Sequence, residues 1–439
     1  MVESTLQNSA PVPSARGVAI DLLGAVLRRH RPLDDAIDEA PDLPALSVRD
    51  RAFARLLVAT VLRRLGQIDA LIAHCLATPL PPRAAQVHDM LRLGIAQLLF
   101  LRTPAHAAVA TTVDLADARG FLTHKGLVNA VLRRLSQDGP VLVAQQDAAR
   151  LNTPKWLWSA WAGAYGEENT RRIAEVHLRE APLDITVSAD RADWATRLDA
   201  TQLPTGTLRR AAGGAIANLP GYGEGLWWVQ DAAAAIPASL FGDVRGKRLI
   251  DLCAAPGGKT AQLAAAGAVV TAIDRSPRRL DRMISNLDRL SLKVETVSAD
   301  AVNWRPADGP AWGVLLDAPC TATGAIRRHP DVPHLKSPDD VTRLAAVQER
   351  LLGAAVEMLE PGGTLVYCTC SLEPEEGPQQ IAKLLAKGLP IARKPIQAEE
   401  VGGLTEILTP EGELRTLPCH LADYDGIDGF FASRLVRTH

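Results

Sequence analysis

From Lys247 to the end of the chain, short apolar runs alternate with segments of helical periodicity. The helical segments repeat apolar residues at three- and four-residue spacings. The apolar runs, which end in Asp or Cys, are RLIDLCAAP, AVVTAID, KVETVSAD, GVLLDAPC and GTLVYCTC. Such runs are typical of strands buried on both faces, and their alternation with helices is typical of parallel strands joined by crossover helices. The pattern predicts a parallel α/β domain over residues 241–439.

Acidic residues stand at the ends of several of these strands. In a parallel sheet, ligands bind outside the carboxyl ends of the strands, where these side chains lie. Asp274 follows Asp251 by 23 residues, a spacing at which an acid can accept both hydroxyls of a ribose. Asp300 ends the third strand and is placed to border an adenine ring. A single Asp is more often a helix cap, but acids at three strand ends together predict a cofactor that contains adenosine.

The segment DLCAAPGGKTAQL joins the first strand to the helix after it. Gly257 and Gly258 let the backbone approach a ligand closely, and amide groups at a helix start can hold a carboxylate or phosphate. The segment lacks the GxGxxG spacing, which weakens a dinucleotide interpretation.

After the fourth strand, VLLDAPCTATGAIRRHPD supplies Asp317 and Cys320 beside the expected nucleoside pocket. Enzymes that methylate amino groups carry a proline and an aromatic residue here, because their target nitrogen is already nucleophilic. Carbon 5 of cytosine is not nucleophilic, so a thiolate must first add to C6, with an acid at N3 to stabilise the developing charge. A base then removes the C5 proton after methyl transfer. The combination favours methylation of a cytosine.

Two further cysteines, Cys368 and Cys370, lie in LVYCTCSLEPEEG at the end of the fifth strand. Alternation along a strand places both on one face and Thr369 on the other. A metal pair usually needs CxxC spacing and a second pair elsewhere, so no metal site is expected. The chemistry alone leaves Cys320 and Cys370 as almost equal candidates for the nucleophile.

Residues 15 to about 135 have a helical pattern, interrupted at RRHRPL, ATPLPPR and LRTPAH by proline. We expect an all-helical bundle. This part has a net positive charge and the rest a net negative one, which hints at a surface that faces phosphates; solvated helix faces explain the charge equally well.

The region from 146 to 240 combines an aromatic-rich helix with short strands, PLDITVSA and GLWWVQD. We expect a small α+β region. Its Trp and Tyr side chains could stack on bases, but packing in a small core is the preferred interpretation for each of them.

The composition, with 47% hydrophobic and 22% charged residues, is typical of a globular protein. The start, MVESTLQNSAPVPSARG, lacks the pattern of an export signal, and the apolar runs are too short to cross a bilayer. We therefore expect a cytoplasmic protein without membrane association, whose cysteines are reduced thiols.

Four motifs carry a resemblance to a known family. DLCAAPGGKT, DAPCTATGAIRRHPD, YCTCSLEPEEG and DGFFASRL occur in the order typical of the RsmB (Sun/Fmu) family of 16S rRNA cytosine-5 methyltransferases, in the NOP2/NSUN superfamily. The helical first part, with DRAFARLLVATVLRR and GLVNAVLRRL, resembles the NusB-like domain of the RsmB branch. The resemblance implies a NusB-like RNA-binding bundle over residues 1–145, a middle α+β region over 146–240 and a Rossmann-like class I methyltransferase domain over 241–439.

The resemblance also implies roles for single residues. Cys370 is the nucleophile, Cys320 assists product release and Asp317 is the acid, while Cys368 stands where the family often has Ser or Ala and is interpreted as a small buried filler. S-adenosylmethionine is the implied cofactor. The residues that the resemblance places around it are Cys253, Ala254, Ala255, Pro256, Gly257, Gly258, Lys259, Asp274, Arg279, Asp300 and Asp317.

By resemblance, the expected function is methylation of cytosine C5 in small-subunit rRNA through a covalent adduct, with RNA and not DNA as the partner. A monomer is the default expectation. Lys259 and the RRHP run at 327–330 are further candidates for RNA contacts, with helix capping and surface charge as the alternative. Two other functions stay open: methylation of transfer RNA, and a non-catalytic RNA-binding role of the assembly or antitermination type.

Overall fold

The computed structural model describes residues 13–438, which form two compact units. The first unit contains the chain up to Trp158 together with His329–Leu335, and the second contains Ser159–Arg328 and the chain from Lys336 onward. Most of the stretch on which the export-signal expectation rests, residues 1–12, lies outside the described residues. The boundaries near 145 and 240 that divide the chain into three parts stay a prediction.

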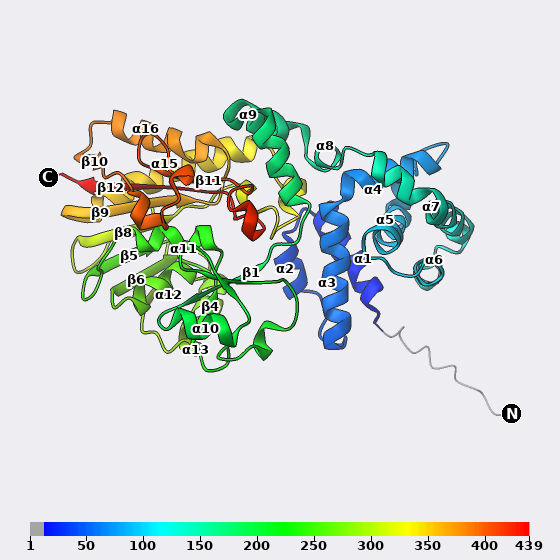
Figure 1. The fold of residues 1–439 in the computed structure, drawn as a ribbon, viewed down its shortest axis with the longest axis horizontal. Coiled ribbons are helices and arrows are strands. Elements are labelled where there is room, and N and C mark those ends of the chain that lie inside the picture. The colour runs from blue at the N-terminus through cyan, green and yellow to red at the C-terminus, as the bar shows by residue number, and fades with distance from the viewer. Residues whose placement is uncertain (1–12, 439) are drawn as a thin grey trace. The chain divides into compact units, whose positions relative to one another are not determined.

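The first unit is helical, as predicted (Figure 1). Ser14 and Ser47 begin two of its helices by accepting backbone N–H groups of the first turn, the usual role of an N-cap serine. Its core consists of the apolar helix faces, with Ile20, Leu57 and Leu91 all fully buried. The helices are α1 (Ala15–Leu27), α2 (Leu33–Asp38), α3 (Val48–Arg63), α4 (Leu65–Cys75), α5 (Ala85–Ile95), α6 (Ala105–Ala118), α7 (Lys125–Gln145), α8 (Ala148–Asn152) and α14 (Val332–Leu335).

Helix α9 (Lys155–His177) leads into the second unit, which begins with a small antiparallel sheet of order β2-β3-β1-β4. Trp194 and Trp227 are buried in the core of this sheet with Ile185 and Leu208. These two indole rings pack in a small core, which agrees with the preferred interpretation of the aromatic side chains in this region. The elements are β1 (Leu183–Val187), α10 (Arg191–Arg197), β2 (Thr201–Gln202), β3 (Leu208–Arg210) and β4 (Trp227–Val229).

The rest of the second unit contains a larger sheet of order β10-β12-β9-β8-β5-β6-β7, with β11 paired to β12. The predicted parallel arrangement is confirmed for β5 to β9, and the strands after β9 are antiparallel to it or to each other. The strands are β5 (Arg248–Leu252), β6 (Val269–Asp274), β7 (Glu295–Ser298), β8 (Ala311–Asp317), β9 (Leu359–Thr369), β10 (Ile391–Arg393), β11 (Leu414–Thr416) and β12 (Phe430–Arg437).

Helices cover both faces of this sheet (Figure 1). On β9, Val366 and Cys368 pack in one cluster with α11 and α12, whereas Leu365 and Tyr367 pack in another with α15 and α16. Burial on both faces explains why the strands read as continuous apolar runs. The helices are α11 (Ala232–Ser239), α12 (Gly258–Ala265), α13 (Pro277–Arg289), α15 (Pro338–Glu357) and α16 (Pro378–Ala386). None of the helices in residues 13–438 is both long and apolar enough to cross a bilayer.

Candidate active site at the carboxyl ends of the strands

A cavity of about 230 Å³ lies at the carboxyl ends of β5, β6 and β7. Four residues expected around the cofactor line it: Cys253, Asp274, Arg279 and Asp300. Its other lining residues, which the sequence did not single out, are Ile273, Arg275, Ala299, Ala301, Val302, Pro319, Val347, Arg350 and Leu351. The mixture of apolar walls with two carboxylates at strand ends suits a nucleoside.

Asp274 holds the loop after β5 against the end of β6. Its side chain accepts the backbone N–H of Ala255 at 3.2 Å and that of Ser276 at 2.9 Å. Arg279 lies 3.3 Å from the same carboxylate and also donates to the carbonyl oxygen of Ala255. Asp274 is therefore both a wall of the cavity and the support of the glycine-containing loop.

At one position, Gly257, that loop has a backbone conformation that only glycine adopts easily. Gly257 has φ of 97°, and a Cβ there would come within 2.4 Å of Met283 Cγ. Helix α12 begins at the next residue, so the loop ends in free amide groups. Cys253 enters the cavity as a neutral thiol, because burial raises its pKa to about 12.

Asp251 and Asp300 have contrasting surroundings. Asp300 is exposed, and its two carboxylate oxygens accept Val302 N and the Asn303 amide, each at 3.0 Å. Asp251 is 1% exposed and accepts Thr260 Oγ1 at 2.6 Å, and burial raises its pKa to about 7. Asp300 can thus face a ligand directly, whereas Asp251 supports the start of α12.

The ends of β8 and β9 bring two thiols together. Cys320 Sγ and Cys370 Sγ are 3.5 Å apart, although the residues are separated by 50 positions in the chain. The hydrogen bond with Cys370, followed by burial, raises the pKa of Cys320 well above its usual value. Cys368 points to the same face of β9 as Cys370, as strand alternation predicted, and is fully buried.

Asp317 is the last residue of β8 and precedes Cys320 by three positions in the chain. Lys259 Nζ donates to Asp317 Oδ2 at 2.6 Å, and Cys368 Sγ lies 3.5 Å from Asp317 Oδ1. Burial disfavours the charged form of Lys259, but the adjacent Asp317 carboxylate outweighs it and raises the pKa of the lysine. Lys259 is only 8% exposed, so its interpretation as a surface contact for RNA is wrong; it is a partner of Asp317.

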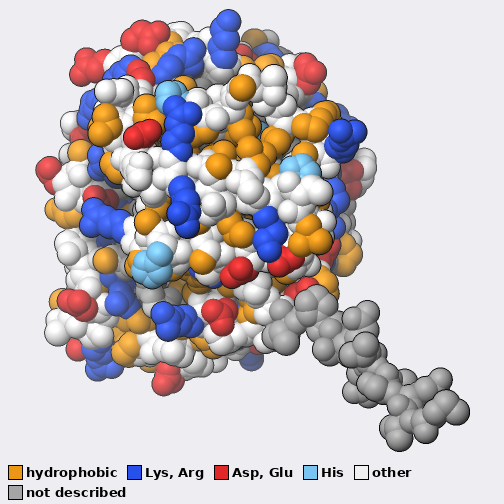
Figure 2. Space-filling view, turned by 90° about the vertical axis from the view of Figure 1, so that its right-hand side faces the viewer, with side chains coloured by type: hydrophobic (Ala, Val, Ile, Leu, Met, Phe, Trp, Pro, Cys, Tyr) orange, Lys and Arg blue, Asp and Glu red, His pale blue; other side chains and the backbone are white. Residues whose placement is uncertain are grey.

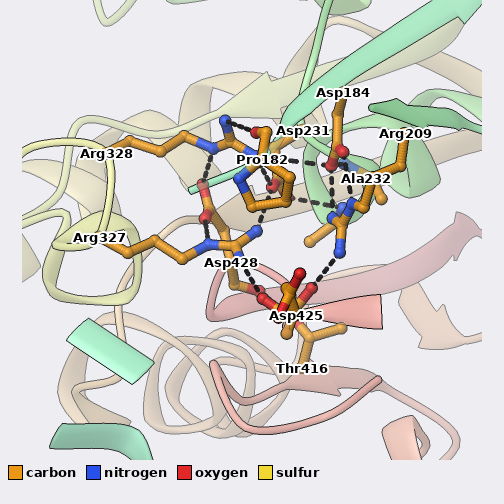
Figure 3. Close-up of polar contacts among 12 residues, drawn as sticks. Pro182, Asp184, Arg209, Asp231, Ala232, Arg327, Arg328, Thr416, Asp425 and Asp428 are labelled. Carbon is orange, nitrogen blue, oxygen red and sulfur yellow. Dashed lines mark hydrogen bonds and ion pairs between the residues drawn. The ribbon is translucent and has the colours of Figure 1, made fainter. Parts of the chain in front are cut away.

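The two arginines of the RRHP run, Arg327 and Arg328, were expected to contact RNA, but they bind carboxylates within the protein. Arg327 is 1% exposed and donates to Asp428 at 2.6 Å and to Asp231 at 3.0 Å (Figure 3). Arg328 donates to the same two carboxylates, at 3.1 and 2.6 Å. Burial disfavours ionisation of Asp231, but the two guanidinium groups outweigh it and hold its pKa well below the usual range.

Both arginine side chains are thus engaged by buried carboxylates, and the expectation that they contact RNA is wrong. A nearby pair, Arg209 and Asp184, joins the same region at 2.6 Å, and Ala232 N donates to Asp184 as well (Figure 3). We call Arg327, Arg328, Asp231, Asp428 and Asp184 the buried charge cluster. It fixes the chain just after the loop that carries Cys320, residues 318–322, which we call the Cys320 loop.

Sequence reasoning missed two buried acids in this region, Glu373 and Glu376. Glu376 is fully buried and accepts hydrogen bonds from residues next to both cysteines. Nothing in the spacing of the acidic run EPEEG distinguishes Glu376 from Glu375, which is exposed.

A parallel sheet with a nucleoside-sized cavity at its strand ends, next to an acid and two thiols, defines the class of protein: a methyltransferase that uses S-adenosylmethionine. The residues around the cavity fit this cofactor, since acids at two strand ends are available for hydroxyl and amino groups. A family model described as "16S rRNA methyltransferase RsmB/F" matches residues 240–436, and a NusB family model matches residues 13–137.

Curated relatives give the particular family. The chain is 34% identical to the ribosomal RNA small subunit methyltransferase B of Klebsiella pneumoniae, across 96% of this chain and 98% of the relative. It is 36% identical to the protein of the same name from Pseudomonas putida, with the same coverage. The chain belongs to the ribosomal RNA small subunit methyltransferase B family. The crystal structure of PH0851 shares the fold, with a TM-score of 0.75 over 95% of this chain and 98% of that chain at 22% identity.

Proposed function

We propose that this protein methylates C5 of cytosine in small-subunit ribosomal RNA, with S-adenosylmethionine as methyl donor. The observation that carries the proposal is the 3.5 Å approach of the Cys320 and Cys370 thiols, with Asp317 at the end of β8, the strand before Cys320. A nitrogen or oxygen target would need no thiol, whereas C5 of cytosine requires covalent activation. The names of the curated relatives supply the substrate, small-subunit ribosomal RNA.

In the proposed reaction, the Cys370 thiolate forms a bond to C6 of the cytosine, and C5 becomes nucleophilic. Asp317, whose side chain is held by Lys259, donates a proton to N3 as negative charge develops there, and takes it back when the Cys370–C6 bond breaks. The cofactor supplies the methyl group to C5. A base then removes the C5 proton, the electron pair re-forms the C5–C6 double bond, and the Cys370–C6 bond breaks. Cys320, whose thiol contacts that of Cys370, assists this release.

The target base must leave its stack to reach the thiols, since C6 is not accessible within a helix. We assign the binding of the surrounding RNA to the NusB-like part, residues 1–145, and to the middle region, 146–240, with the chemistry in residues 241–439. Figure 2 shows a face on which Lys and Arg side chains are spread among hydrophobic ones, and α7 exposes Arg133 and Arg134. Such charges support phosphate binding. The enzyme acts as a monomer, in the cytoplasm where ribosomal subunits are assembled.

Substrate mapping tests the proposal. Purified protein is incubated with methyl-labelled S-adenosylmethionine and either unmodified small-subunit RNA or transfer RNA, and the product is mapped by bisulfite sequencing. We expect 5-methylcytosine at a defined position in the ribosomal RNA. Methyl label in transfer RNA alone would show that transfer RNA, and not ribosomal RNA, is the substrate. Cofactor binding without turnover on either RNA would favour a non-catalytic assembly factor.

A further inference from the structure

Glu376 lies in the loop that carries Cys370, residues 370–377, which we call the Cys370 loop. Its side chain is fully buried and contacts the Cys320 loop at Thr321. Its Oε1 atom accepts Thr321 N at 3.0 Å and Gln348 Nε2 at 3.1 Å. Its Oε2 atom accepts Ser371 Oγ at 2.6 Å and the hydroxyl of Thr321. One carboxylate thus collects donors from three separate segments of the chain.

Two of these donors adjoin the cysteines directly. Thr321 follows Cys320, and Ser371 follows Cys370. The two hydroxyl groups also contact each other at 3.2 Å. Any change in the position of the carboxylate is therefore passed to both cysteine loops.

The backbone of Glu376 is anchored to the same strand that presents Cys370. Its carbonyl oxygen accepts the Tyr367 hydroxyl at 2.7 Å and Thr369 Oγ1 at 3.2 Å. Both donors belong to β9. The carboxylate is thus held at a fixed place relative to the end of β9. Its hydrogen bonds with Thr321 therefore fix the position of the loop after β8 relative to β9.

We propose that Glu376 is a positioning residue for methyl transfer: its carboxylate joins the Cys320 loop to the Cys370 loop and sets the separation of the two thiols. This inference rests on the proposed function, in which both thiols act on one cytosine. Because Glu376 is fully buried, it acts through Thr321 and Ser371 and not by contact with substrate. Burial raises the pKa of Glu376 above its usual value, and the hydrogen bonds from these two side chains offset only part of that rise.

The substitution Glu376→Gln tests the role at nearly constant shape. An amide has one acceptor oxygen and one donor nitrogen, so it cannot accept from Gln348, Thr321 N and Ser371 together. Glu375→Gln is the matched control, because Glu375 is the neighbouring residue, is exposed and undergoes the same change of charge. Ser371→Ala removes a single donor and serves as a milder second variant if Glu376→Gln does not fold.

The distance between the thiols is read by cross-linking. Diamide oxidises the two thiols to a disulfide and is itself reduced to the hydrazine, and the rate is followed by mass spectrometry under native conditions. Turnover on RNA, KM and cofactor affinity are measured in parallel. We expect Glu376→Gln to slow formation of the Cys320–Cys370 disulfide and lower kcat at least tenfold, with KM for RNA and cofactor affinity within about twofold of wild type. Ser371→Ala should be intermediate and Glu375→Gln unchanged.

A wild-type rate of cross-linking together with a wild-type kcat in Glu376→Gln, or in Ser371→Ala where the first variant fails to fold, would overturn the inference. A loss of cofactor affinity as large as the loss of kcat would also overturn the inference, because it would indicate general damage to the fold. Failure of wild-type protein to methylate RNA would contradict the proposed function instead, and the cross-linking rates would then decide the role of Glu376 alone.

Discussion

The cavity that we propose for the cofactor, called the cofactor cavity below, and the cysteine loops lie at the same edge of the sheet. They are held in place by different interactions. Around the cavity, Asp274 and Asp300 accept hydrogen bonds from nearby backbone N–H groups. The cysteine loops depend on partners far away in the chain: Glu376 binds Thr321 across 55 residues, and Arg327 binds Asp428 across 101. Substitutions near the cavity should therefore mainly weaken cofactor binding, whereas those that support the loops should lower stability or turnover.

The largest effect is expected in the buried charge cluster. Arg327→Met leaves the buried carboxylates of Asp231 and Asp428 with one guanidinium group in place of two. Removing one partner of a buried ion pair costs about 3–5 kcal/mol. We expect a loss of that order in the free energy of unfolding of the second unit, measured by urea denaturation.

The control for this variant is Arg343→Met, which breaks an exposed pair with Asp340 on α15. Exposed pairs contribute less than about 1 kcal/mol, so its unfolding curve should nearly overlay that of wild type. Equal losses for Arg327→Met and Arg343→Met would remove the distinction between the two regions.

Glu373, in the Cys370 loop, provides a prediction that depends on pH. It accepts the Trp161 indole N–H at 3.1 Å, and burial raises its pKa from 4.5 to about 7. Between these values the folded state keeps a proton that the unfolded state has lost, so the free energy of unfolding falls as the pH rises. The contribution is at most about 3 kcal/mol.

Glu373→Gln removes this ionisation and keeps the acceptor for Trp161. At pH 4.5 the variant and wild type should unfold at similar temperatures, and above pH 7 the variant should be the more stable of the two. The measurement is the midpoint of thermal unfolding as a function of pH. A difference that does not change with pH would contradict the assignment.

Asp274→Asn probes the cofactor cavity. The amide keeps the shape of the side chain but loses the charge and one acceptor, and hydrogen bonds to charged groups contribute about 1.5–3 kcal/mol. We expect the dissociation constant of S-adenosylhomocysteine to rise by about tenfold or more in calorimetric titrations. The rate of Cys320–Cys370 cross-linking should not change, and a slower rate would show that the two regions are not independent.

Cys368→Ala should have the smallest effect on the reaction. The thiol is buried and contacts Asp317 at 3.5 Å, a weak hydrogen bond beside the 2.6 Å contact from Lys259. We expect a loss of about 1 kcal/mol in stability and turnover within about fivefold of wild type. Cys370→Ala, two residues away, should have no measurable turnover, so equal activities in the two variants would contradict the assignment of the nucleophile.

The cofactor cavity and the cysteine loops also differ in how much of their structure could be predicted from the sequence. The parallel sheet, the helical first part and the placing of Asp274 and Asp300 at strand ends followed from local periodicity, because strand ends in a parallel sheet meet at one edge. Strand alternation also placed Cys368 and Cys370 on one face correctly.

The supports of the cysteine loops could not be predicted, because they depend on tertiary contacts. Arg327 and Lys259 looked like surface cations until their partners were known, and Glu376 looked like one acid among several. Only the folded chain brings Asp428 and Asp231 to Arg327 or Thr321 to Glu376. The covalent role of Cys370 itself came from family resemblance and stays a prediction.

The measurement that tests the central claim most directly is a denaturing-gel assay for covalent protein–RNA adducts. Cys320→Ala and Cys370→Ala are each incubated with unmodified small-subunit RNA and S-adenosylmethionine. If Cys370 attacks the base and Cys320 assists its release, Cys320→Ala accumulates an adduct of reduced mobility and Cys370→Ala forms none. An adduct in Cys370→Ala and none in Cys320→Ala would contradict this account and exchange the roles of the two thiols.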